Sequence, residues 1–216
     1  MDRSFAFILA TLSALAAWAT QVARPEPELG ALDPDSFTLE PPPRPLDWDA
    51  LVPEADGFDW PVGPPAAQGY YDAQPFGRND HLGEDWNGVG GGDSDLGDPV
   101  YALAHGWVSL AEDVGRGWGQ VVRVVHRVPP EEPGGRAQVV ESLYAHLDTI
   151  EVEVGDLILR GQQLGTIGDA GGLYPAHLHL ELRERPGMPV GGGYSRDTRG
   201  YLSPSAFITE HRPRAR

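Results

Sequence analysis

Glycine and proline divide most of this chain into short apolar runs, and this division constrains its fold more than any other feature. The 216 residues include 28 Gly and 21 Pro. Between them lie short runs rich in Val, Leu and aromatic residues, at 99–104, 106–110, 120–126, 139–144 and 177–183. Runs of this length bounded by turn residues are typical of β-strands, and no window beyond the N-terminal segment shows a helical period. The sequence therefore predicts an all-β domain.

The chain before this domain divides into two parts. Residues 1–23 contain a short charged start and an apolar run from Phe5 to Ala19, a pattern typical of a signal peptide or an uncleaved membrane anchor. Residues 24–57 are rich in Pro and acidic residues and predict a largely irregular linker or wrapping segment. We place the folded domain at 58–210 and a disordered tail at 211–216. The N-terminal segment predicts export to the periplasm or the exterior, with or without anchoring to the cytoplasmic membrane.

Composition excludes several kinds of function. The net charge of −16 argues against nucleic acid as a partner, because phosphate binding needs clustered Lys and Arg. Cysteine is absent, which excludes disulfides, thiol nucleophiles and thiolate zinc sites. Any metal must then be bound by imidazole and carboxylate groups.

The last apolar run carries two histidines on one predicted strand face. Side chains alternate along a strand, so His177, His179 and Glu181 share one face and the leucines between them share the other. The leucine face supplies core. The opposite face brings two imidazoles close enough for one to bind a metal while the other handles a proton, although a solvent-facing strand would carry the same pattern.

Two further motifs complete the set. His81 and Asp85 flank Gly83 in a glycine-rich stretch that indicates a loop, so we expect a turn to bring them together. His146 follows Tyr144-Ala at the end of an apolar run, where a buried core histidine is the alternative. Two His and one Asp with an open fourth position are the ligands of a catalytic zinc site. Together the three motifs predict a zinc hydrolase.

In order and content these motifs resemble the lysostaphin and LytM-like zinc metallopeptidases, which cut peptide bonds in bacterial cell-wall peptidoglycan. The accompanying patterns of that family are present at 99–108, 154–162 and 164–168, so the resemblance covers about residues 60–208. It implies a mostly antiparallel sheet of the duplicated hybrid motif type, here preceded by a short N-terminal helix and the Pro/acid-rich linker.

The resemblance also implies roles for five residues. His81, Asp85 and His179 would hold Zn²⁺, and His146 and His177 would transfer protons; which of these two is the general base stays open. Such a zinc ion lowers the pKa of its bound water to about 7 and polarises a peptide carbonyl, and a neutral imidazole can accept the water's proton.

Two other functions fit the same motifs. One is a non-catalytic LytM-like regulator of another cell-wall hydrolase, which the complete set of five residues disfavours; the other is a zinc peptidase acting on secreted proteins. The oligomeric state is left open, as is whether the acidic linker covers the groove. The stretch between His126 and Tyr144 and the loop from Gly88 to Asp98 are longer than the resemblance leads us to expect. Because loops carry specificity, both predict borders of the substrate groove.

Overall fold

The computed structural model describes residues 46–115, 117–130, 132 and 134–213, all within the unit Pro45–Arg216. The expected signal peptide or anchor at 1–23, most of the expected linker, and residues 214–216 lie outside the described residues. Among the described residues, no helix is both long enough and apolar enough to cross a membrane.

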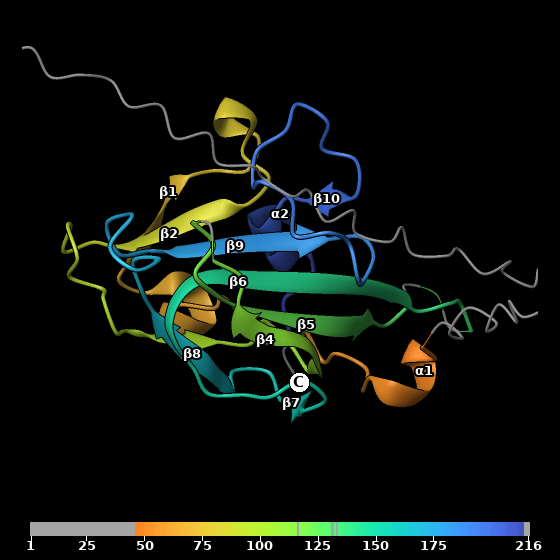
Figure 1. Cartoon of the computed structure of the whole chain (residues 1–216). Coiled ribbons are helices and arrows are strands. Elements are labelled where there is room, and N and C mark those ends of the chain that lie inside the picture. The colour runs from red at the N-terminus through yellow and green to blue at the C-terminus, as the bar shows by residue number, and fades with distance from the viewer. Residues whose placement is uncertain (1–45, 116, 131, 133, 214–216) are drawn as a thin grey trace, which may run out of the picture. The chain divides into compact units, whose positions relative to one another are not determined.

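Antiparallel strands dominate the domain and confirm the predicted fold class. The main sheet has the order β1-β2-β9-β6-β5-β4-β7, and each neighbouring pair is antiparallel (Figure 1). These strands are β1 (Tyr70–Gln74), β2 (Glu84–Gly88), β9 (Leu178–Arg183), β6 (Gln138–Ile150), β5 (Gln120–Val128), β4 (Gly106–Asp113) and β7 (Leu157–Ile158). Off this path, β3 (Pro99–Tyr101) pairs with β8 (Gln163–Ile167), β8 also pairs with β6, and β10 (Tyr201–Leu202) pairs with β9.

The two faces of β9 differ as the alternation predicts. Leu178, Leu180 and Leu182 are fully buried in the main core together with Val122 and Val124 of β5. The histidine and charged side chains of β9 belong to the other face. That face also carries a smaller apolar cluster of Trp118, Val121, Leu143 and Ala145. The period-two pattern of this strand therefore separates structural side chains from candidate functional ones.

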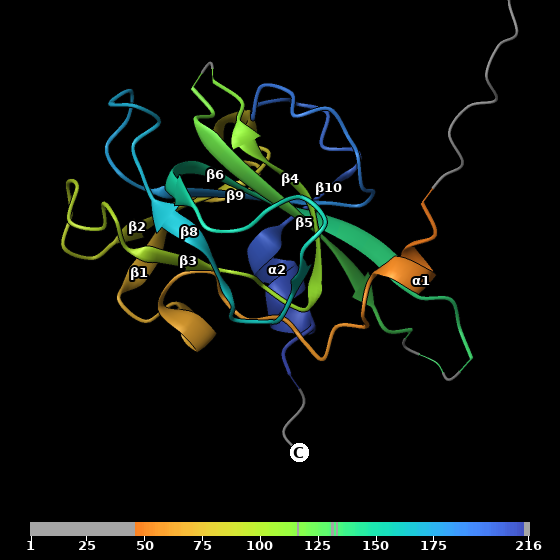
Figure 2. The same cartoon turned by 60° about the horizontal axis from the view of Figure 1, so that its bottom comes forward.

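A short helix, α2 (Pro204–Glu210), contacts β9 from the core side of the sheet (Figure 2). Ser203 caps its first turn, and Phe207 and Ile208 are buried. The prediction of no helix beyond the N-terminal segment is wrong here. A helix of seven residues spans only about two turns, too few to display a helical period.

Residues 46–57 wrap around the domain that we expected to begin at 58. They include the short helix α1 (Trp48–Leu51), whose Trp48 ring packs against Trp107 at a centroid distance of 5.6 Å. Val52 and Ala55 are buried. This part of the expected linker therefore contributes apolar side chains to the domain.

The C-terminal residues that follow α2 are held by the same region. The His211 ring stacks on Phe207 at a centroid distance of 4.0 Å, and the Arg212 guanidinium donates to the carbonyl oxygens of Phe58 and Pro65 at 3.1 and 2.8 Å. The expectation of disorder from residue 211 is therefore wrong for residues 211–213, because these contacts order them.

Candidate metal centre and cleft

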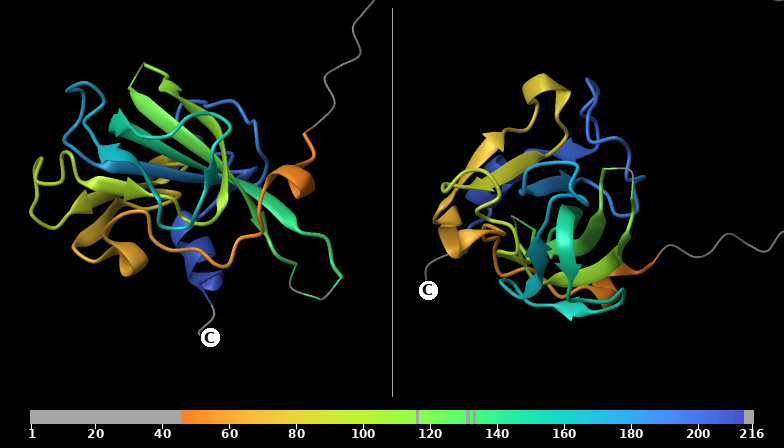
Figure 3. Two further views of the ribbon diagram at one scale, coloured as in Figure 1. Left: turned by 90° about the horizontal axis from the view of Figure 1, so that it is seen from below. Right: turned by 60° about the vertical axis from the view of Figure 1, so that its left-hand side comes forward.

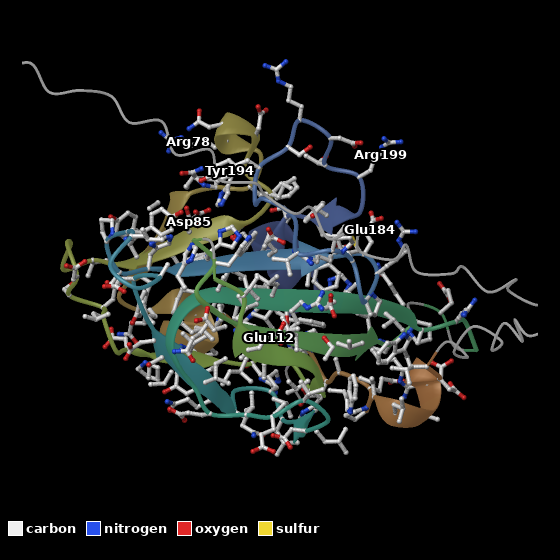
Figure 4. All side chains as sticks on the ribbon, viewed as in Figure 1. Arg78, Asp85, Glu112, Glu184, Tyr194 and Arg199 are labelled. Atoms are coloured by element: carbon white, nitrogen blue, oxygen red, sulfur yellow. The ribbon has the colours of Figure 1, made fainter. Side chains whose placement is uncertain are left out.

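His81, Asp85 and His179 converge on one point of the sheet. Asp85 lies on β2 directly opposite His179 on β9, and His81 ends the helical turn Arg78–Asp80 that precedes β2. His81 Nε2 lies 3.1 Å from His179 Nδ1 and 3.5 Å from Asp85 Oδ1, and the last two atoms are 2.9 Å apart. Figure 4 shows the labelled Asp85 on β2, at the side of the sheet where Tyr194 also lies.

The route to this convergence differs from the expected one. The glycines around Asp85 predict a loop, but the residue lies in a strand whose cross-strand partner is His179. Because side chains alternate along β2, Glu84 points the other way, and its carboxylate accepts hydrogen bonds from Ser205 N and Oγ of α2. Strand pairing, and not a turn, brings Asp85 to the second histidine.

Outer hydrogen bonds fix which nitrogen of each histidine faces the centre. His81 Nδ1 lies 3.0 Å from the Gln74 carbonyl oxygen, and His179 Nε2 lies 3.3 Å from Glu181 Oε1. A carbonyl and a carboxylate only accept, so these nitrogens carry protons. His81 Nε2 and His179 Nδ1 are left facing each other and Asp85, an arrangement in which metal-binding histidines are usually held.

The ionisation of the three groups reflects burial and mutual contact. Burial lowers the pKa of His81. For Asp85, burial opposes the charged form, but the hydrogen bond from His179 and the charges of the neighbouring histidines together hold the pKa below its usual range. For His179, burial also opposes the charge, yet the hydrogen bonds to Asp85 and Glu181 raise the pKa to about 9. At His179 the contacts with the two carboxylates thus outweigh burial.

The three atoms fit a divalent ion. Ligand atoms at roughly 2.0–2.2 Å from a tetrahedral zinc ion are about 3.3–3.6 Å apart, within a few tenths of an ångström of the observed separations of 2.9, 3.1 and 3.5 Å. Two imidazole nitrogens and one carboxylate oxygen are also the donor types that zinc accepts. The structure therefore contains a possible His–Asp–His metal site.

His146 and His177, the two residues expected to transfer protons, lie beside this centre. Their ring centroids are 4.7 Å apart, and His177 Nε2 is 3.7 Å from Asp85 Oδ1. His146 Nδ1 lies 3.3 Å from the Trp118 carbonyl oxygen and His177 Nδ1 lies 2.8 Å from the Pro175 carbonyl oxygen. Each Nδ1 therefore donates, and each Nε2 keeps a free lone pair.

A local distortion of β6 accompanies the position of His146. Its φ is +62°, and the register with β5 shifts beside it. A positive φ is costly for a non-glycine residue, and bulges re-aim side chains next to active sites. Burial, with the neighbouring His179 and His177, lowers the pKa of His146 to about 3. This histidine is therefore neutral at physiological pH.

Asp85, His146, His177 and His179 line a cleft of about 300 Å³, whereas His81 is fully buried behind it. Its walls also contain residues that the sequence analysis did not identify: Trp118, Tyr174 and Tyr194, with Gly117, Gly192 and Gly193. They lie in loops, where no strand or helix period marks them. A cleft lined by aromatic rings and glycines can accept an extended peptide next to the metal site.

The prediction that the long β5–β6 hairpin borders the groove is wrong. The described residues between these strands (129, 130, 132 and 134–137) lie where β6 begins, next to α1 (Figure 3). His146 lies eight residues further along β6, about 26 Å at the usual rise per residue. The Gly88–Asp98 loop does not line the cleft either, but its Asp93 carboxylate accepts from Ala176 N at 2.9 Å and so supports the chain just before His177.

Comparison with known proteins identifies the family. The model of Peptidase family M23 matches residues 84–191, half of the chain. The chain therefore belongs to Peptidase family M23, which confirms the family resemblance inferred from the motifs. The matched segment contains Asp85, His146, His177 and His179, while His81 lies just before it.

More specific similarities cover parts of larger proteins. The cell division protein DipM of Caulobacter vibrioides is 32% identical over 90 residues, which are 42% of this chain and 13% of DipM. This chain thus spans a small part of that curated relative. Among solved structures, lysostaphin from Staphylococcus simulans is 24% identical, with 65% of this chain and 48% of lysostaphin covered and a TM-score of 0.44. A mutant catalytic domain of the prophage-encoded M23 protein EnpA from Enterococcus faecalis is 21% identical, with 68% and 95% covered and a TM-score of 0.47.

Proposed function

We propose that this protein is an exported zinc-dependent endopeptidase that hydrolyses peptide bonds in the stem or cross-bridge of bacterial cell-wall peptidoglycan. Membership of Peptidase family M23 supports the peptidase activity. The observation that carries the metal dependence is the meeting of His81 Nε2, Asp85 Oδ1 and His179 Nδ1 within 3.5 Å of one another. The proposed site of action is the periplasm or the cell exterior.

In this proposal His81, Asp85 and His179 hold the ion. A zinc ion bound there would supply a Lewis acid and a water of lowered pKa. The Gln74 carbonyl oxygen and Glu181 orient the two imidazoles, and the cleft leaves the side facing His146 and His177 open to a peptide.

His146 and His177 transfer the protons. Because their Nδ1 atoms donate to backbone carbonyls, each Nε2 can accept a proton from the attacking water and return it to the leaving amine. The lowered pKa of His146 keeps its ring neutral at pH 7, the form in which Nε2 accepts. The two rings are in contact, so either Nε2 can take up the water's proton, and the ring that then carries it can donate it to the leaving amine.

A second candidate function is a non-catalytic regulator of another cell-wall hydrolase, favoured by the similarity to a cell division protein. The geometry favours catalysis over this role, because a purely regulatory domain does not need three convergent ligands and two histidines with free nitrogens. The two candidates share a fold and differ in whether zinc and turnover are present.

One digestion experiment separates the candidates. The purified full-length chain is incubated with zinc and either purified peptidoglycan or casein, and the fragments are identified by mass spectrometry. We expect cuts in wall peptides that stop after chelation and resume with added zinc. Fragments from casein but not from peptidoglycan would instead indicate a peptidase of secreted proteins, and zinc binding without fragments would indicate the regulator.

A pair of histidine variants tests the assigned chemistry. His146→Ala should retain zinc while turnover falls about 10²- to 10⁴-fold, the usual contribution of general acid–base catalysis. His105→Ala is the matched control, because its Nδ1 accepts from Arg160 N away from the cleft, and it should keep wild-type turnover. Unchanged turnover in His146→Ala would contradict the assigned role.

A further inference from the structure

A fully buried ion pair lies behind the metal-facing histidine of β9. Glu181 and Arg183 are both 0% exposed, and Glu181 Oε2 lies 2.6 Å from one terminal nitrogen (Nη2) of Arg183 and 2.8 Å from its Nε. Burying two charges is costly unless their remaining hydrogen-bonding groups are satisfied. The partners of these groups therefore indicate what the pair holds in place.

The carboxylate of Glu181 connects the pair to the metal centre. Its second oxygen, Oε1, accepts from His179 Nε2 at 3.3 Å, while Oε2 is occupied by Arg183. The proton of the neutral His179 ring is thereby directed to Nε2, and Nδ1 is kept as the ligand atom. Partners of this kind typically change metal affinity by 10- to 100-fold when they are removed.

The guanidinium of Arg183 connects the pair to the loop that follows β9. Besides the two bonds to Glu181, it donates to the carbonyl oxygens of Met188, Pro189 and Val190 at 3.3, 3.2 and 2.9 Å. All five of its N–H groups therefore have an acceptor. A lysine has three donors without this planar geometry and cannot replace them.

The same loop forms one wall of the cleft. Gly192, Gly193 and Tyr194 line the cleft a few residues after the carbonyls that Arg183 holds. Figure 4 labels Tyr194 in this loop, together with Glu184 and Arg199 near its two ends.

Two backbone hydrogen-bond acceptors of this loop anchor it to neighbouring segments. The Gly191 carbonyl oxygen accepts from Trp118 Nε1 at 3.2 Å, and the Gly193 carbonyl oxygen accepts from Leu82 N at 2.9 Å. The wall is therefore fixed on both sides, and Arg183 holds its start.

We propose that Glu181 and Arg183 are a positioning pair. The pair sets which nitrogen of His179 binds the metal, and it holds the Gly192–Tyr194 wall of the cleft at a fixed position relative to that nitrogen. Glu181 acts on the metal ligand and Arg183 acts on the substrate wall. Neither side chain touches the substrate. The inference rests on the proposed function for the identity of the metal and the substrate.

Two substitutions separate these two actions. Glu181→Gln replaces the carboxylate by an amide, whose NH₂ group cannot accept from Arg183; zinc affinity, measured by chelator competition, should fall about 10- to 100-fold. Arg183→Lys keeps the charge beside Glu181 but loses the bonds to the loop carbonyls. At saturating zinc its KM for wall peptides should rise about 10-fold or more, because small displacements of a binding wall are costly, while its zinc affinity should change less than that of Glu181→Gln.

Arg160→Lys is the matched control. Arg160 also forms a planar pair with a carboxylate, Asp56, at 2.8 and 3.0 Å, but it does not line the cleft. It should change the melting temperature without changing KM or zinc affinity. A purely structural role for Glu181 and Arg183 would give the same pattern as this control, and that result would overturn the proposal.

A measurement on the wild-type chain needs no substitution and decides the matter where a variant does not fold. Nitrogen-15 NMR of the histidine rings in the zinc-loaded protein should show His179 protonated at Nε2, and protonation at Nδ1 instead would overturn the proposal. Absence of zinc binding and hydrolysis in the wild-type chain would be a failure of the proposed function itself, and so is distinct from a wrong tautomer or a missing division of effects.

Discussion

Strand β6 takes part in two histidine clusters that differ in how their ring nitrogens are used. The core cluster consists of His126 of β5 with Ser142 and Tyr144 of β6. His126 is fully buried, and its Nδ1 is bonded to the His105 carbonyl oxygen at 3.0 Å and its Nε2 to Ser142 Oγ at 2.7 Å. In the cleft cluster (His81, His146, His177, His179 and Asp85), each ring uses one nitrogen for a backbone or Glu181 acceptor and keeps the other toward the cleft or the ligand set.

The difference in hydrogen bonding between the two clusters shows what makes a histidine available for chemistry in this fold. A hydroxyl both donates and accepts, so Ser142 satisfies the second nitrogen of His126 and is also bonded to the Tyr144 hydroxyl. The core cluster is then closed, and burial lowers the pKa of His126 to about 4. Each cleft ring has a backbone or Glu181 acceptor on one side, and its second nitrogen faces Asp85 and the ligand set or the cleft. Their free nitrogens, and not their burial, distinguish them.

The largest effect is expected when a ring that faces the ligand set is removed. His81→Ala should weaken zinc binding by more than about 100-fold, beyond the typical loss of an outer partner, and should reduce wall hydrolysis to background. Metal content by mass spectrometry and fragment release measure the two effects. Full zinc content in this variant would show that His81 is not a metal ligand, and would contradict the distinction between cleft rings that bind metal and a core ring that does not.

Removing the core ring should instead affect stability. His126→Ala leaves a cavity and an unpaired Ser142 hydroxyl, so the free energy of unfolding should fall by about 4 kcal/mol. Urea unfolding measures the loss, and turnover per folded molecule should stay at the wild-type value. A variant of wild-type stability but reduced turnover would show that the core cluster belongs to the active site.

The pH dependence of stability should show a somewhat smaller effect from the same ring. In the unfolded chain His126 binds a proton near its ordinary pKa of 6.5, whereas in the folded chain it does so only near 4. The stabilising contribution is therefore complete above pH 6.5 and is lost as the pH falls toward 4, by at most about 3 kcal/mol. Comparing urea unfolding of wild type and His126→Gln across this range isolates it, and parallel pH curves would contradict the assignment.

The smallest effect is expected at the end of β6 that lies away from the cleft. Replacing residues 129–137 by a tight turn should leave zinc content unchanged and turnover within about two-fold, because the hairpin does not line the cleft, and stability should change by about 1 kcal/mol or less. A loss of wall hydrolysis with casein hydrolysis intact would show that the hairpin selects the substrate after all.

The sequence predicts the parts of the site that depend on local rules. The separation of His179 from Leu178 and Leu180 follows from side-chain alternation alone. The pairing of Asp85 with His179 could not be derived in this way, because it depends on the register between segments 94 residues apart. The aromatic walls Trp118, Tyr174 and Tyr194 were missed because loops carry no period.

Two other features escaped prediction for reasons of length and of local geometry. Helix α2 is too short to show a period, although Ser203 followed by Pro204 is a recognisable helix start. The positive φ of His146 arises where β6 changes register against β5. The residue type alone does not predict the bulge or its direction, since a positive φ is uncommon for any non-glycine residue.

The most direct test of the account is the position of zinc in crystals of the metal-loaded protein, located by anomalous scattering at the zinc edge. We expect one strong peak within roughly 2.0–2.2 Å of His81 Nε2, Asp85 Oδ1 and His179 Nδ1, with no peak at His126. A peak bound by other residues, or no peak in protein that hydrolyses the wall, would contradict it.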